Sequence, residues 1–263
     1  MKSLLIACSL SAFPLMLHAQ GAAPDIAGFR PGTPAADAYK QLQQYAGPGR
    51  RIVVGHQNVP DLNAGPIIHE LQMSEGDPDS SAEVIELDLT LPPEPQRVWR
   101  VVRMVRLAAG HEMLPQALIE GLRTKYGPEQ RPMSDTVRGM WWFDHAGARQ
   151  AVPTSMTCDG VIPTPKIDGG IQYTTGAGTQ RSDLLLPLQR VDASFAPCRT
   201  LTEVGALYQT EQAHHLVISY IVQLMDLGIE AHAHEATVAQ LADRAAAREA
   251  ATKKRAAQEK PSL

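Results

Sequence analysis

The sequence predicts an α+β fold in which two strand-helix-strand units build a mostly antiparallel sheet and a helix ends the chain. Three observations predict it: two helical patterns that both end at Gly-Pro, apolar alternation typical of strands, and an alanine-rich C-terminal stretch. With 263 residues, of which 44% are hydrophobic, the chain is long enough to bury a core. The formal net charge is -4 and no strongly basic region is present, so we expect no nucleic-acid partner.

The chain begins with the layout of a cleaved secretory signal peptide. Residues 1–19 hold one cation at Lys2, an apolar run and a small residue at Ala19. No later apolar segment reaches the roughly 18 residues that a membrane span needs, so we expect no transmembrane segment in the mature chain. We therefore expect a periplasmic or secreted protein. Lipidation of Cys8 is an open alternative, because the preceding residues fit a lipidation box.

Two segments predict the same helical element. Each has apolar residues at helical spacing, a proline in its first turn and a Gly-Pro pair at its end. The segments are GTPAADAYKQLQQYAGPG at residues 32–49 and MLPQALIEGLRTKYGPE at residues 113–129. In the first, we expect Thr33 to cap the helix and Pro34 to be the first helical residue. The glycines that end the two helices, Gly47 and Gly127, lie 80 residues apart.

Segments with strand character flank both helices. Before them stand IAGF at residues 26–29 and VWRVVRMVRL at 98–107, and after them RIVVGHQNV at 51–59 and TVRGMWWFD at 136–144. We therefore expect a strand-helix-strand unit that is used twice within residues 24–145. Chance recurrence of a common helix ending is the alternative.

The arginine-rich segment at residues 98–107 is ambiguous by periodicity alone. Its valines favour a strand, and EVIELDLTL, just upstream, alternates apolar and acidic residues. We therefore expect an antiparallel hairpin across PPEPQ, in which the arginines pair with Glu86 and Asp88. An anion-binding or partner-binding surface that includes Arg100 and Arg103 is the functional alternative.

Residues 146–233 are rich in turns and form the predicted third region. Cys158 and Cys198 are the two cysteines of the mature chain, and in an oxidising compartment we expect them to form a disulfide. LVISYIVQLMDL predicts the strongest strand, with one face formed by Ile218, Tyr220, Val222 and Leu224 and the other by Ser219, Gln223 and Met225. Residues 234–263 predict a C-terminal helix that packs at its start and frays beyond Ala245.

The first helical segment resembles a known family. Phe29-Arg30-Pro31-Gly32-Thr33, an alanine-rich helix and Gly47-Pro48 together resemble, over residues 28–48, the entry of small envelope proteins of the SmpA/OmlA type, which assist outer-membrane assembly. The resemblance implies an α+β interaction module. The leader, the paired helices and the cysteine pair also look like those of secreted bacterial envelope proteins.

Histidines are the candidate metal ligands. If HAHE at residues 232–235 is extended, its imidazoles share one face, and a site for zinc or copper could then include His214, His215, His232, His234 and Glu235. If the segment is helical, the two imidazoles of HAHE diverge. Solvated surface histidines are the alternative. The sequence lacks HExxH and GxSxG, and TTGAGT does not form a phosphate-binding loop.

These patterns favour a non-catalytic protein over an enzyme, and we expect no cofactor. We expect it to bind another envelope protein through sheet edges or exposed aromatic side chains. The candidate contacts are Trp141, Trp142, Arg100 and Arg103. Core packing is the simpler explanation of both tryptophans, and contact with a partner or a glycan is the other. An envelope metal-binding protein or metalloenzyme that uses the histidine cluster is the alternative function.

Overall fold

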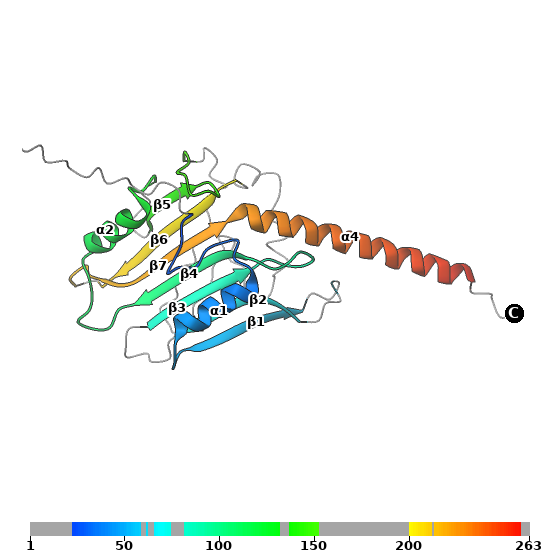
Figure 1. The fold of residues 1–263 in the computed structure, drawn as a ribbon, viewed down its shortest axis with the longest axis horizontal. Coiled ribbons are helices and arrows are strands. Elements are labelled where there is room, and N and C mark those ends of the chain that lie inside the picture. Colours follow the sequence, from blue (N-terminus) through cyan, green and yellow to red (C-terminus); the bar gives the residue numbers. More distant parts are fainter. Residues whose placement is uncertain are drawn as a thin grey trace, which may run out of the picture.

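A computed structural model describes residues 23–58, 62, 66–74, 82–131, 137–152, 200–211 and 213–258. The described residues form one seven-stranded sheet and three helices, which confirms the α+β class (Figure 1). The strands are β1 (Arg51–Asn58), β2 (Pro66–Ser74), β3 (Ala82–Leu89), β4 (Val98–Arg106), β5 (Val137–Phe143), β6 (Thr202–Thr210) and β7 (Val217–Asp226). The predicted signal peptide and the predicted disulfide between Cys158 and Cys198 lie outside the described residues.

All neighbouring strands are antiparallel, in the order β1-β2-β3-β4-β7-β6-β5. Helix α1 (Ala35–Ala46) leads into β1 at one edge of the sheet, and helix α2 (Pro115–Tyr126) leads into β5 at the other. From each edge the strands that follow in the sequence lie successively closer to the centre of the sheet, where β4 pairs with β7. The series that begins at β5 includes β6 and β7, which lie beyond residue 145. The segment before α1 is a tight turn closed by a bridge between Ile26 and Phe29.

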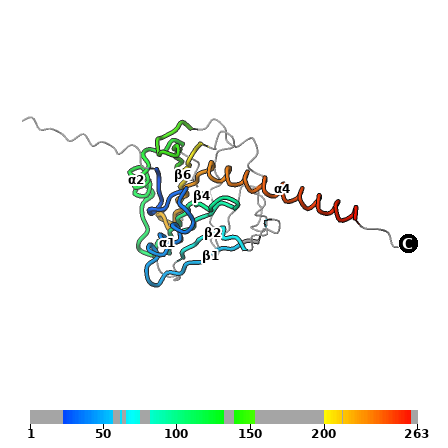
Figure 2. Tube along the Cα trace, turned by 45° about the vertical axis from the view of Figure 1, so that its right-hand side comes forward, coloured from blue at the N-terminus to red at the C-terminus, as the bar shows by residue number. Residues whose placement is uncertain are grey.

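Helices α1 and α2 lie on the same side of the sheet (Figure 2). Both contribute to one core, α1 through Ala38, Leu42 and Ala46, and α2 through Leu122 and Tyr126. The sheet supplies the alternate residues of its strands that point toward the helices, such as Ile85, Leu87, Val204 and Leu224. This shared core explains why both helical segments need an apolar stripe.

The predicted ends of the two helices are confirmed, whereas the predicted cap of the first is wrong. Gly47 and Gly127 end the helices with φ angles of 61° and 81°. The residue that precedes α1 is Pro34, and the Thr33 hydroxyl donates instead to the carbonyl of Arg30 at 2.8 Å. The Thr33 carbonyl accepts the N–H of Val98 at 2.8 Å, so pairing with β4 keeps Thr33 outside the helix.

Strand β7 is buried on both faces over its second half. Val222 and Leu224 point into the core under the helices, and Gln223 and Met225 are buried on the opposite face. The alternation predicted from the sequence is therefore present.

Helix α4 (Leu227–Gln258) begins directly after β7, seven residues before the predicted start at 234. The Asp226 carboxylate ends the strand and accepts the N–H of Ile229 at 3.0 Å, which stabilises the first helical turn. The helix packs on the body through Thr237, whose hydroxyl lies 2.6 Å from the carbonyl of Pro92, and through Leu241, which packs against Leu62 and Ile67. Beyond Ala245 every described residue is exposed, yet the chain stays helical to Gln258 instead of fraying (Figure 1).

Candidate functional site

The arginine-rich strand forms the expected hairpin, and its two candidate contact residues lie on opposite faces of the sheet. Arg100 pairs with Glu86, at 3.1 Å between Nη2 and Oε1, and with Asp88, as predicted. Arg103 pairs instead with Glu83 at 2.7 Å. Residues three apart in a strand point to opposite sides, so one continuous arginine surface is excluded.

Arg100 lies within a cluster of carboxylates. The side chains of Glu70, Glu86 and Asp88 place oxygens within 4.8 Å of one another, and Arg100 is a cation that at least two of them share. Burial alone would lower the pKa of Arg100, but Asp88 and Glu86 outweigh burial and raise it. Burial raises the pKa of Glu230, in the first turn of α4, to about 8, and Asp88 adds to the effect. The cluster is therefore a buried ion-pair network within the sheet, and its charges act on Glu230 at the start of α4.

The two tryptophans are both buried, so the predicted exposed aromatic contacts are wrong. Each indole is 1% exposed. Trp141 packs on the helix side of β5, against Tyr126, and its Nε1 donates to the carbonyl of Gly127 at 2.8 Å. Trp142 points to the other side and its Nε1 lies 3.3 Å from Glu203. Core packing accounts for both side chains.

The structure does not bring the candidate metal ligands together. His214 and His215 precede β7, whereas His232, His234 and Glu235 follow it in α4, so a strand of ten residues, roughly 33 Å long, separates the two groups. Because HAHE is helical, His232 is exposed and His234 is buried. His214 pairs with Glu211 at 2.9 Å, and His232 pairs with Glu94 at 3.1 Å. The predicted histidine cluster is therefore not formed.

The two edges of the sheet differ in how the chain covers them. The outer side of β5 bonds to its own flanking segments: Met140 donates its N–H to the carbonyl of Arg131 at 3.2 Å, and Trp142 accepts the N–H of Gln150 at 2.9 Å. At the other edge, β1 pairs with β2, and no described segment pairs with its outer side. Strand β1 therefore offers an open edge within the described part of the chain.

Apolar side chains line this open edge on both faces. Ile52 and Val54 point toward α1 and are only partly buried against the core, while Val53 points to the opposite face and is 36% exposed. The Tyr45 hydroxyl donates to Glu83 of β3 at 2.8 Å, so that flank of α1 faces the centre of the sheet. Tyr39, also 36% exposed, lies roughly 120° around the helix, on the flank toward β1.

The sequence pattern identified residues 51–59 as strand-like without marking them as a functional candidate. The sequence did contain a signal for an edge strand. In both halves the strand that directly follows the helix, β1 after α1 and β5 after α2, lies at an edge of the sheet. Among the described helices, none is long and apolar enough to cross a membrane. Comparison with protein families, with curated proteins and with solved structures finds no match to this chain.

Proposed function

We propose that the protein is a non-catalytic interaction module of the cell envelope, which binds another envelope protein by accepting an extended segment beside β1. The contrast between the two sheet edges carries this proposal. Flanking segments cover the outer side of β5, whereas no described segment pairs with the outer side of β1, so a partner strand can add its backbone hydrogen bonds there.

The side chains around β1 favour an apolar, extended partner segment. A strand added beside β1 would extend the core next to Ile52 and Val54 on the helix side and would cover Val53 on the other side. Its backbone would provide affinity, and its alternate side chains would provide specificity. The predicted secretory leader and the resemblance at residues 28–48 support an envelope partner.

The test compares two valine variants of similar exposure at opposite edges of the sheet. Val53→Lys places a charge on the open edge, and Val152→Lys places the same charge at a residue that is 39% exposed beyond β5. Full-length mature protein and both variants are immobilised and incubated with envelope extract. We expect one partner to be retained by the parent protein and by Val152→Lys and to be lost from Val53→Lys at an unchanged melting temperature.

Amide hydrogen exchange then locates the contact. With the purified partner, exchange should slow within residues 51–56 and stay unchanged in β5. A partner that still binds Val53→Lys, slowed exchange away from β1, or no retained partner would each contradict strand addition at this edge.

A further inference from the structure

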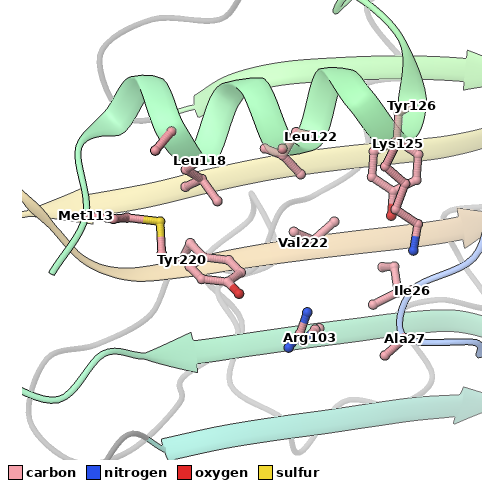
Figure 3. A pocket seen from close by; sticks show the side chains of 12 residues that line it. Ile26, Ala27, Arg103, Met113, Leu118, Leu122, Lys125, Tyr126, Tyr220 and Val222 are labelled. Carbon is pink, nitrogen blue, oxygen red and sulfur yellow. The ribbon is translucent and has the colours of Figure 1, made fainter. Parts of the chain in front are cut away.

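A cavity of about 290 Å³ lies between α2 and the centre of the sheet (Figure 3). Leu118 and Leu122 of α2 form its apolar roof, and Val222 of β7 lies beneath them. Tyr220 and Arg103 complete the floor. The volume is at the lower end of the roughly 300–1,000 Å³ range of small-molecule sites, which also combine apolar walls with a few polar groups.

Helix α2 presents a glycine to this space. Gly121 lines the cavity, and a Cβ at this position would have no neighbouring atom within 4 Å. The residues one turn away on either side, Ala117 and Lys125, also line it, and the Lys125 side chain is directed to the rim, where it pairs with Asp25 at 3.0 Å. The cavity is therefore open to solvent along one flank of α2, and Leu118 and Leu122 make its roof apolar.

Arg103 gives the floor its charge. Its Nε donates to Glu83 at 2.7 Å, and the described residues offer its two terminal nitrogens no hydrogen-bond acceptor. In Figure 3 the guanidinium nitrogens and the Tyr220 hydroxyl lie on the same side of the cavity floor. The terminal nitrogens of a guanidinium form a planar fork that matches a carboxylate, so Glu83 orients the group and leaves this fork available.

We propose that this cavity binds a small amphipathic carboxylate, with its apolar body beneath Leu118 and Leu122 and its carboxylate on the terminal nitrogens of Arg103. The apolar walls select the body of the ligand, and the fork selects its charge. The site is separate from the β1 edge, because it lies under the helix of the second repeated unit.

The probe is 3-phenylpropionate, titrated into the full-length mature protein by calorimetry, and 3-phenylpropanol serves as its uncharged counterpart. We expect the carboxylate to bind at least about tenfold more tightly than the alcohol, because the alcohol cannot accept both hydrogen bonds of the fork. Gly121→Leu fills the cavity from an exposed helix position, so the fold should be kept while binding falls by about tenfold or more. Arg103→Gln should reduce binding of the carboxylate to that of the alcohol.

Gln116→Leu is the matched control, since it adds the same side chain at an exposed position of α2 outside the cavity lining. It should bind 3-phenylpropionate as the parent protein does. Equal affinity for the acid and the alcohol would overturn the role of Arg103. Unchanged binding in Gly121→Leu, or no binding of 3-phenylpropionate at millimolar concentration, would overturn the site.

Discussion

Replacing Glu230 with glutamine should remove a pH-dependent loss of stability. Burial raises the pKa of this carboxyl from 4.5 to about 8, and Asp88 adds to the effect while Arg100 opposes it. Because the pKa is raised, the folded protein holds a proton that the unfolded chain releases between pH 4.5 and about 8. The stabilising contribution of protonated Glu230 to the free energy of unfolding is therefore fully present below pH 4.5. It falls as the pH rises through this window and is lost above about pH 8.

The magnitude follows from the width of the window. Each pH unit between the two pKa values lowers the free energy of unfolding by up to about 1.4 kcal/mol. Over three pH units, and reduced for the partial exposure of Glu230, the loss is on the order of 2 to 4 kcal/mol. Glutamine has the shape of the protonated acid and cannot ionise. The stability of Glu230→Gln relative to the parent protein should therefore rise by this amount between pH 5 and pH 8.

Urea unfolding of both proteins at several pH values measures the difference. Subtracting the two curves cancels the titration of all other groups that the variant leaves unchanged. Glu120→Gln, at an exposed position of α2, is the control and should give a flat difference. A flat difference for Glu230→Gln as well, or one that falls with rising pH, would refute the view that burial keeps this carboxyl protonated.

Four further outcomes are expected. Leu42 is wholly buried under α1, so Leu42→Ala should cost about 2–5 kcal/mol in urea unfolding, and a smaller loss would show that the core collapses around the missing side chain. Gly121→Ala should stabilise the protein by about 0.5–1 kcal/mol in the same assay, because alanine favours the helix and its methyl group meets no neighbour; destabilisation would contradict this. Deleting the residues after Ala245 should lower the melting temperature by less than about 5 °C, since every described residue of that part of α4 is exposed, and a larger drop would mean that the tail packs. Mass measurement after alkylation should find Cys158 and Cys198 modified only in reduced protein, whereas free thiols in unreduced, freshly isolated protein would exclude the disulfide.

Local sequence patterns determined the elements whose causes are local. The glycines at 47 and 127 end helices because the chain there adopts positive φ angles, which glycine tolerates best. The hairpin of β3 and β4 follows from alternation on both sides of a short turn, and the same alternation placed Glu86 and Asp88 opposite Arg100. None of these features depends on distant parts of the chain.

Tertiary structure decided the features that depend on which strands meet. Alternation alone could not show that β7 lies between β4 and β6, that Gln223 is buried, or that α4 starts at Leu227, with HAHE inside a helix. Nor could it show that the segments flanking β5 fold back along its outer side while no described segment pairs with the outer side of β1, because the alternation within a strand does not reveal how the neighbouring turns fold. The burial of both tryptophans and the cavity beneath Gly121 have the same cause: exposure is set by what packs against a side chain, and those neighbours come from other elements.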